Sequence, residues 1–362
     1  MAKSLLFLPD ISGYTKFIQT TEVEHSQHII SELLEVLIAA NTENMELAEI
    51  EGDALFFYKE GEVPSQERLL AQIETMFTAF YNHLEFLKKN RICPCNACAT
   101  APDLELKIIA HAGQLQHIEV QGTRKPFGQQ VIEAHRLMKN SVNSDNYVLI
   151  SRSLAFEIQL SAYYSSKLFR FRQGSDHYDD TTIDYLYSLI DTQQLPLKEP
   201  ETVAEIEIER PADLIFEREY PVGAEKLYEY ISNLIYRAEW VKGVDRFDFK
   251  VNEVTRCGTE HVCVVNGKDL NFVSVTKAGE PGQLVYGEMT RDLLPVDAIY
   301  QFYTITPLSE NTCHLKVELF WEAKSPLKRI MIALFAKKAF EKNTRTALEG
   351  LFDFAQHKRS DV

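Results

Sequence analysis

The chain has 362 residues, a hydrophobic content of 45% and a formal net charge of −15 at pH 7. This length predicts two domains, and the apolar content argues against wholesale disorder. The negative charge disfavours non-specific nucleic-acid binding and attraction to anionic membranes. Six cysteines do not make a secreted disulfide framework. We find no signal peptide and no transmembrane segment, so we expect a soluble cytoplasmic protein.

The first half of the chain alternates strand and helix patterns. Strand patterns lie at 4–8, 45–50, 54–58, 104–110, 115–120 and 147–150. Helix patterns lie at 13–19, 23–40, from 64 onward and at 129–138. This mixed order predicts an α+β fold in which helices cover a sheet.

The composition changes near residue 193, where the chain becomes rich in proline and charge. This change predicts a linker at 191–203 between one domain at 1–190 and another at 204–362. Strand patterns in the second half lie at 214–220, 247–254, 261–265, 272–277, 283–289, 299–307 and 314–322. Helix patterns lie at 224–232, near 236 and from 326 to about 355.

Two aspartates of the first half are candidate metal ligands. Asp10 follows an apolar run, and Asp53 lies in a tight turn between two strand patterns. Two carboxylates delivered to one place would suit a hard cation such as magnesium, which usually serves phosphate chemistry. The alternative interpretation is that Asp10 caps a helix and that Asp53 is an ordinary turn residue.

Four segments of the first half resemble, in the same order, the motifs of class III nucleotidyl (adenylate and guanylate) cyclases. The segments are FLPDISGYT at 7–15, EIEGDA at 49–54, IAHAG at 109–113 and FGQQVIEAHRL at 127–137. The resemblance covers residues 4–188 and implies a cyclase-like domain with a ferredoxin-like core. It also implies a homodimer, because two protomers of this family pair head to tail to complete each site.

The resemblance implies that two divalent ions, magnesium or manganese, bind a nucleoside triphosphate. It assigns these ions to Asp10, Asp53 and the backbone carbonyl of Ile11, and the ribose 3′-hydroxyl attacks the α-phosphate in such enzymes. It assigns Arg136 to the stabilisation of phosphate charge through its fork of donors. Ile132 replaces a family asparagine and has no side-chain donor, and losing one such donor typically costs about 10²–10³ in rate. We therefore expect weak or absent cyclisation.

Two further positions bear on recognition of the base. Glu49 stands where guanylate cyclases place a carboxylate that accepts from guanine, whereas adenylate cyclases place lysine there. Lys125 departs from the aspartate or small residue of the family. Lys125 either pairs with Glu49 and blocks the base pocket, or is a solvated side chain. The choice between ATP and GTP therefore stays open.

A loop of the first half concentrates three cysteines, Cys93, Cys95 and Cys98, in six residues. Three close thiols in a cytosolic chain suit zinc or another thiophilic metal. Zinc prefers four ligands, so His111, His117 or a partner chain would have to supply the fourth. The alternative is a reduced surface loop with redox sensitivity.

The second half resembles the START-like helix-grip fold of the SRPBCC superfamily (polyketide cyclase and lipid-transport proteins) in its element order and in the segment YRAEW at 236–240. This resemblance covers residues 204–356 and implies an apolar cavity between a curved sheet and the last helix, suited to a hydrophobic small molecule or lipid. Ordinary core is the alternative for each candidate wall residue. The candidates are Trp240, Phe272, Tyr286, Tyr300, Phe302, Phe320, Met331 and Phe335.

Together these features predict a cytosolic signalling protein with two modules. One binds metal and nucleoside triphosphate with weak or lost cyclisation, and the other binds a hydrophobic ligand. Two alternatives stay open: an active guanylate or adenylate cyclase regulated by the C-terminal domain, and a hydrophobic-ligand carrier or sensor with a degenerate cyclase domain. Assays of pyrophosphate release, nucleotide binding and co-purified lipid distinguish the three.

Overall fold

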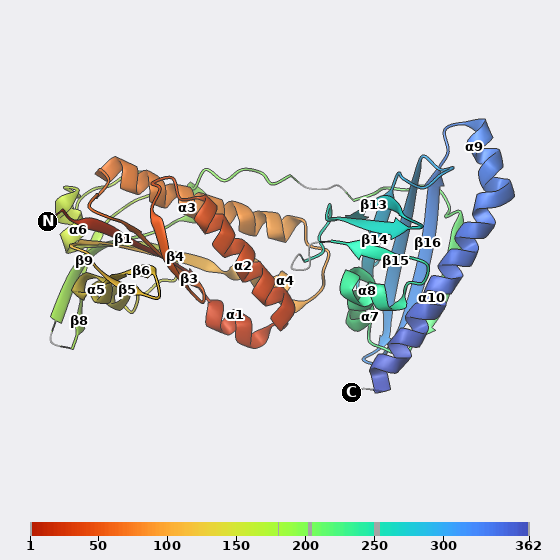
Figure 1. Ribbon diagram of the computed structural model, residues 1–362, viewed down its shortest axis with the longest axis horizontal. Helices are drawn as coiled ribbons and strands as arrows, with labels where there is room; N and C mark the ends of the chain where they lie inside the picture. The colour runs from red at the N-terminus through yellow and green to blue at the C-terminus, as the bar shows by residue number, and fades with distance from the viewer. Residues whose placement is uncertain (1, 180, 202–204, 250–253, 361–362) are drawn as a thin grey trace. The chain divides into compact units, whose positions relative to one another are not determined.

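The structure is a computed structural model that describes residues 2–179, 181–201, 205–249 and 254–360. The chain forms two compact units (Figure 1). The first comprises Met1–Lys88 and Asn96–Pro200, and the second comprises Lys89–Cys95 and Glu201–Val362. The predicted linker and the predicted strand at 247–254 include residues 202–203 and 250–253, which lie outside the described residues. No helix in the described ranges is both long enough and apolar enough to cross a membrane.

The first unit is built on a seven-stranded sheet with the order β2-β3-β1-β4-β7-β9-β8. Neighbouring strands are antiparallel, except that β4 and β7 are parallel. The strands are β1 (Ser4–Ser12), β2 (Glu46–Glu51), β3 (Ala54–Lys59), β4 (Glu105–Gly113), β7 (Tyr147–Ser151), β8 (Arg172–Tyr178) and β9 (Thr181–Leu189). The helices are α1 (Tyr14–Thr20), α2 (Val23–Ala39), α3 (Gln66–Lys89), α4 (Asn96–Thr100), α5 (Gln129–Leu137) and α6 (Arg152–Glu157). This confirms the mixed α/β class.

Strand β1 lies between β3 and β4, and all nine of its residues are buried. Burial on both faces explains why its sequence is a continuous apolar run rather than an alternation. One face packs Leu6 and Leu8 against Ala134 and Leu137 of α5. The two long helices α2 and α3 lie along the sheet in Figure 1. The strand therefore carries Asp10 into a well-packed part of the unit.

Five strands and helices of the first unit have no counterpart among the predicted ones: α4, α6, β8, β9 and a strand β6 (Thr123–Phe127). β6 pairs only with β5 (Gln116–Val120), and the two form a ribbon separate from the main sheet. A polar sequence explains why β8 was missed, because it reads RQGSDHY and lies at the sheet edge. An edge strand needs little apolar alternation.

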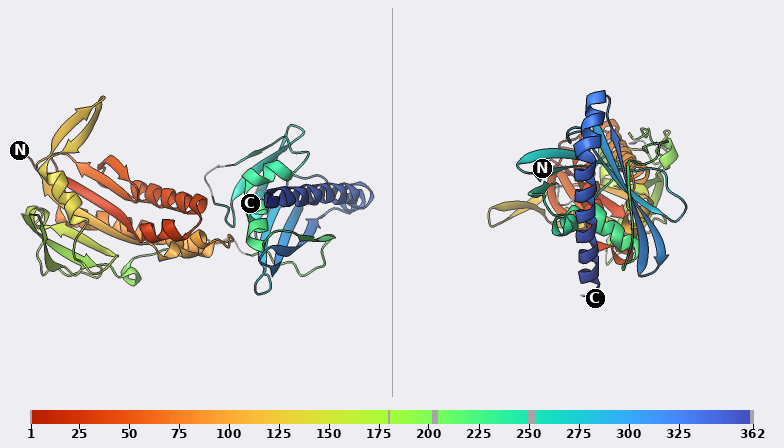
Figure 2. Two further views of the ribbon diagram at one scale, coloured as in Figure 1. Left: turned by 90° about the horizontal axis from the view of Figure 1, so that it is seen from below. Right: turned by 90° about the vertical axis from the view of Figure 1, so that its right-hand side faces the viewer.

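The second unit contains a seven-stranded antiparallel sheet with the order β10-β16-β15-β14-β13-β12-β11. The strands are β10 (Leu214–Tyr220), β11 (Arg246–Asp248), β12 (Glu260–Val265), β13 (Lys268–Val275), β14 (Leu284–Thr290), β15 (Ala298–Ser309) and β16 (Thr312–Glu322). The helices are α7 (Ala224–Ser232), α8 (Leu234–Trp240), α9 (Pro326–Met331) and α10 (Lys337–Ser360), with a π-helical turn η3 (Ile332–Ala336) between the last two. Figures 1 and 2 show α10 running across this sheet.

The eight candidate wall residues of the second unit do not line one common space. Trp240 and Tyr286 belong to the core that α7, α8 and α10 share with the sheet. Phe302 and Phe320 belong to a separate cluster, and the alternation along β14 and β15 puts Phe302 on the face opposite Tyr286. The segment around Ile206 packs against this second cluster.

The remaining four candidates also differ in their surroundings. Tyr300 packs at the edge of the Phe302 cluster, and Phe272 stacks on His261 with ring centroids 5.4 Å apart. Met331 and Phe335 are 52% and 73% exposed, which contradicts their assignment to a cavity wall. Met331 lies in α9 and Phe335 in η3, both before α10 begins. The START-like resemblance therefore stays a prediction.

Candidate functional site

The strongest candidate site of the first unit is the neighbourhood of Asp10 and Asp53. Asp10 lies opposite Ala54 in the β1–β3 register, and the Ile11 N–H donates to the Asp53 carbonyl at 3.1 Å. Gly52 adopts a positive φ of 67°, which lets the chain turn sharply just before Asp53. Asp10 is buried and Asp53 is partly buried. The tight turn thus brings the second aspartate to the side of the first.

The two carboxyl groups interact directly. Burial raises the pKa of Asp53 to about 6, and both the charge of Asp10 and a hydrogen bond with it contribute to the rise. Lys107 of β4 faces Asp10 across the strand pair and brings its Nζ to 3.0 Å from Asp10 Oδ2. Burial alone would lower the pKa of Lys107, but Asp10 outweighs it and the pKa is raised. The two carboxyl groups and the lysine amine therefore lie close together in a partly buried site.

The residues around this pair fit a hard divalent cation. Carboxylate oxygens are the ligands that Mg²⁺ and Mn²⁺ prefer. Ser12 lies two residues beyond Asp10 in β1 and therefore on the same side of the strand. Its hydroxyl is buried and has no hydrogen-bond partner among the described residues. A cation would reduce the repulsion between the two carboxylates, and one of its water ligands would give the Ser12 hydroxyl a hydrogen-bond partner. Asp10, Asp53 and the predicted Ile11 carbonyl would hold the ion.

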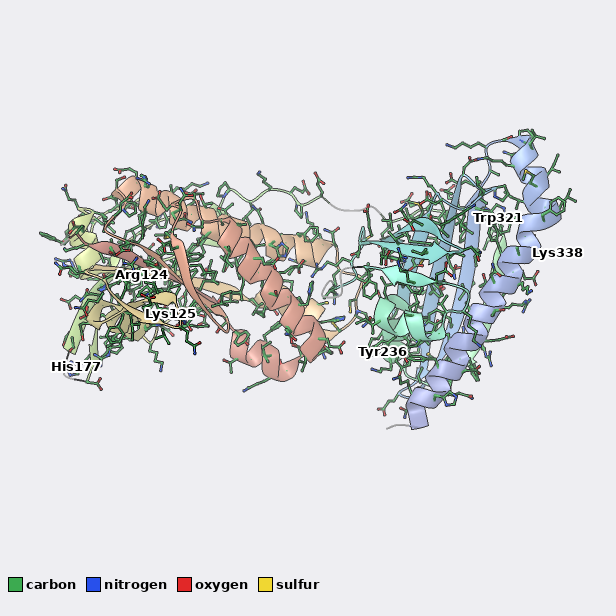
Figure 3. All side chains as sticks on the ribbon, viewed as in Figure 1. Arg124, Lys125, His177, Tyr236, Trp321 and Lys338 are labelled. Carbon is green, nitrogen blue, oxygen red and sulfur yellow. The ribbon has the colours of Figure 1, made fainter. Side chains whose placement is uncertain are left out.

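The two predicted base-recognition residues lie together at the edge of the sheet. Lys125 Nζ of β6 is 3.3 Å from Glu49 Oε1 of β2, and Lys125 is labelled in Figure 3. Both side chains are about half-exposed, with 46% and 45% of their surfaces accessible. Of the two alternatives for Lys125, the ion pair with Glu49 is the one observed. Such an exposed pair is weak and is broken easily by a competing ligand.

The predicted phosphate-stabilising residue has a different partner. Arg136 Nη2 of α5 donates to Asp179 Oδ2 at 2.6 Å, at the end of the β8–β9 hairpin. Ile132, one turn earlier on α5, is 48% exposed. α5 thus presents an ion-paired arginine and an aliphatic side chain where the cyclase resemblance implies two donors.

Lys107 and Ser12 complete the aspartate site and were not predicted from the sequence. Lys107 gave a signal, because it is the one charge in the apolar stretch LKIIA at 106–110. A lone charge in a buried strand usually has a partner. Ser12 gave no comparable signal, because serine is common just before a helix.

A second polar cluster lies in the sheet of the first unit, around His111. His111 is almost fully buried, with Nε2 at 2.9 Å from Gln130 Oε1 and Nδ1 at 3.3 Å from Ser153 Oγ. Burial lowers the pKa of His111 and so favours the neutral imidazole. His117 lies elsewhere, on β5 of the separate ribbon, with Nδ1 at 3.1 Å from Arg124 Nη2. Neither histidine completes the cysteine loop, so both suggested protein ligands from this chain were wrong.

A different histidine meets the cysteine loop. The ligand atoms of His25, Cys93, Cys95 and Cys98 all lie within 4.8 Å of one another, and this group could hold a metal ion. His25 was missed because it lies about seventy residues from the cysteines, in the first turns of α2. Sequence spacing carries no signal for such a contact.

The second unit contains a buried charged network that sequence reasoning also missed. The Arg237 guanidinium of α8 forms a two-pronged ion pair with the Glu288 carboxylate of β14, with Nη2 at 2.7 Å from Oε2. The Tyr286 hydroxyl donates to Glu288 at 2.7 Å, and His261 Nε2 lies 3.6 Å from the same carboxylate. Burial alone would raise the pKa of Glu288, but Arg237 outweighs it and lowers the pKa. The segment YRAEW thus contributes a buried charge as well as the aromatic Trp240.

Comparison with known proteins finds relatives for part of the chain. Residues 30–147 match a family model described as "Protein of unknown function (DUF2652)". The uncharacterized protein Rv2561/Rv2562 of Mycobacterium tuberculosis is 32% identical over 126 residues. That alignment covers 35% of this chain and 58% of the relative, so the chain spans less than two thirds of the relative's length.

Solved structures of cyclase domains are similar to about half of the chain. The adenylyl cyclase CyaB from P. aeruginosa is 17% identical, with 52% of this chain and 94% of that chain covered and a TM-score of 0.39. The guanylyl cyclase Cya2 is 13% identical, with 54% and 97% covered and a TM-score of 0.39. The guanylate cyclase domain of RhGC from Catenaria anguillulae, solved with GTP, is 14% identical, with 52% and 97% covered and a TM-score of 0.37. Similarity at this level carries no argument about activity, which has to come from the residues of the site.

Proposed function

We propose that the first unit binds a divalent metal ion and a nucleoside triphosphate, with Asp10 and Asp53 as metal ligands. The observation that carries this proposal is the contact between the two carboxyl groups, which helps to raise the pKa of Asp53 to about 6. Two carboxylates held this close repel each other unless a proton or a cation lies between them. A bound ion would supply positive charge to the phosphates of the nucleotide.

Lys107 limits the number of divalent ions that the protein binds in the absence of nucleotide. Two carboxylates and Lys107 have a net charge of −1, so one divalent ion already reverses the sign of the site. A second ion then needs the negative charge of the triphosphate. We therefore propose one ion in the absence of nucleotide, and the two ions implied by the family only with it.

We further propose that binding proceeds with weak or lost cyclisation. Ile132 cannot donate a hydrogen bond, and Arg136 is held by Asp179 at 2.6 Å. Glu49, the residue that would accept from guanine, is paired with Lys125 at 3.3 Å. For cyclisation, the donor missing at Ile132 would have to come from elsewhere, and Arg136 and Glu49 would have to leave their present partners. Only then could the phosphates and the base be held in the reactive geometry. An active cyclase is the competing proposal.

For the second unit we propose a hydrophobic small molecule or lipid as ligand. The support is the arrangement of an antiparallel sheet with one long C-terminal helix, which agrees with the helix-grip resemblance. Native mass spectrometry of the freshly purified chain tests this, and a co-purified lipid-like mass is expected. We also propose, from the cyclase resemblance alone, that the protein is a homodimer, which sedimentation of the chain would test.

Calorimetry of nucleotide binding tests the proposal for the first unit. With Mn²⁺ present, GTP or ATP should bind the wild type, and Asp53→Asn should remove most of the heat. Asp184→Asn is a matched control, because Asp184 is an exposed carboxylate on β9, separated from β1 by two other strands. Absence of nucleotide binding to the wild type would contradict the proposal. Pyrophosphate release well above background, lost in Asp53→Asn, would instead establish the active cyclase.

A further inference from the structure

We propose that His25, Cys93, Cys95 and Cys98 bind one zinc ion as a structural Cys₃His site. Their ligand atoms lie within 4.8 Å of one another, and Cys98 Sγ is 3.7 Å from His25 Nδ1. A tetrahedral zinc ion with usual bond lengths separates a thiolate sulfur from an imidazole nitrogen by about 3.6 Å, and two sulfurs by about 3.8 Å. The four atoms therefore need only a small contraction to reach zinc-bound distances.

The local fold holds the cysteine loop beside α2. Glu22, three residues before His25, accepts hydrogen bonds from the backbone N–H groups of Asn96 and Ala97 at 3.2 and 2.9 Å. These two N–H groups belong to the first turn of α4, which begins directly after Cys95. The carboxylate thus satisfies donors that a helix start leaves unpaired. A metal site benefits from this arrangement, because the ligands are brought together before the ion arrives.

The type and burial of the ligands favour zinc over the alternatives. Cys93 and Cys98 are buried, and Cys95 and His25 are partly buried. All six cysteines of the chain are thiols rather than disulfides. A disulfide within this cluster would pair two sulfurs and leave the third thiol beside it. Thiolate and imidazole ligands in a four-coordinate set are typical of closed structural zinc sites, whereas magnesium and calcium prefer oxygen.

The expected role of the ion is to fix the junction between α3, α4 and the start of α2. Binding free energy at such a site becomes folding free energy, because the unfolded chain holds no preformed site. Three thiolates, one imidazole and Zn²⁺ give the cluster a net charge of −1. We expect the site to be independent of the aspartate pair, so its loss should leave Mn²⁺ binding at Asp10 and Asp53 intact.

Two measurements on the 362-residue chain test the proposal. Plasma emission spectrometry of protein purified without chelator should find one zinc per chain. After replacement of zinc by Co²⁺, the visible spectrum should show the intense d–d and thiolate-to-metal bands of a tetrahedral thiolate site. Cys95→Ser should abolish both signals, and Cys263→Ala, which replaces a buried cysteine on β12, should leave them unchanged.

His25→Gln separates the histidine from the thiols. Losing the imidazole should shift the cobalt bands and weaken zinc binding at least tenfold, while keeping thiolate character. If a variant fails to fold, alkylation of the wild type decides: zinc should protect Cys93, Cys95 and Cys98 from iodoacetamide, and a chelator should expose them. Equal alkylation with and without chelator, or a wild type that binds neither zinc nor tetrahedral cobalt, would overturn the proposal and leave a reduced thiol loop.

Discussion

Replacing Asp53 by asparagine should make the first unit more stable at neutral pH while removing its metal site. The rise of the Asp53 pKa from 3.8 to about 6 corresponds to about 3 kcal/mol against the ionised carboxylate. Asp53 is partly exposed, and screening by water reduces this figure to about 1.5 kcal/mol. Asparagine has nearly the same shape and no charge to repel Asp10. We therefore expect Asp53→Asn to raise the free energy of unfolding by about 1–1.5 kcal/mol at pH 7.5 in chelator.

The sign of the pH dependence is part of this prediction. The pKa of Asp53 is higher in the folded state than in the unfolded state, so the folded protein binds the proton more tightly. The stability that the Asp53 carboxyl group contributes is present below pH ~4 and is lost as the pH rises to ~6. Wild type and Asp53→Asn should therefore be equally stable near pH 4 and diverge above it.

Urea unfolding in chelator measures the effect unit by unit. Both tryptophans, Trp240 and Trp321, lie in the second unit, so tryptophan fluorescence follows that unit alone. Far-ultraviolet circular dichroism follows both units. Asp53→Asn should shift the dichroism transition of the first unit and leave the fluorescence transition in place. A variant no more stable than wild type at pH 7.5, with the same pH dependence, would refute the reasoning.

Adding Mn²⁺ should reverse the order of stability. A ligand at 100 times its Kd stabilises the folded state by about 2.7 kcal/mol. The wild type should gain this amount at pH 7.5, and Asp53→Asn should gain little. The same titration below pH 6 should show weaker binding to the wild type, because protons then compete with the metal at Asp53.

Three further substitutions test neighbouring parts of the account. Lys107→Met removes the cation beside Asp10 and should raise Mn²⁺ affinity several-fold, as measured by calorimetry; unchanged or weaker binding would argue against competition between lysine and metal. Lys125→Ala frees the Glu49 carboxylate and should increase the preference for GTP over ATP in competition binding, with less than about 1 kcal/mol lost in stability because the pair is exposed. Arg237→Leu leaves Glu288 buried without its partner and should destabilise the second unit by about 3–5 kcal/mol in fluorescence-monitored urea unfolding; a loss below 1 kcal/mol would mean that water reaches the carboxylate.

Much of the fold could be predicted from periodicity because the central elements are buried. The run at 4–8 and the strand pattern at 54–58 lie in fully packed strands, and the amphipathic pattern from residue 64 becomes the long helix α3. The C-terminal strands follow the same rule, since each predicted run from 261 to 322 overlaps a strand of the sheet. Buried strands and helix faces require apolar residues at regular spacing, and this spacing predicts the elements.

Exposed and edge elements escaped prediction for the opposite reason. β6 and β8 are polar strands outside the centre of a sheet, so neither had to be apolar in alternation. Met331 and Phe335 show the same limit, because helical spacing predicts which residues share a face but not whether a sheet lies beneath it. The exposed fractions of 52% and 73% come from tertiary structure alone.

The candidate site divides along a similar line. Asp10 and Asp53 were predicted as a pair because each lies in a local motif whose turn geometry is encoded nearby. Lys107 and His25 meet their partners across long sequence distances, which no local pattern encodes. The partner of Arg136 likewise comes from a hairpin that was not predicted. The sequence therefore predicted the two aspartates from their local motifs, but it did not predict the long-range contacts that change the charge around the site.

Electron paramagnetic resonance of free Mn²⁺ tests the central claim most directly, because it counts bound ions without requiring turnover. Titrated at pH 7.5 without nucleotide, the wild type should bind one Mn²⁺ per chain, and the Asp10→Asn and Asp53→Asn variants should each lose that ion while Asp184→Asn keeps it. Stoichiometric Mn²⁺ binding that survives both substitutions, or a wild type that binds no ion even with GTP or ATP present, would contradict the account.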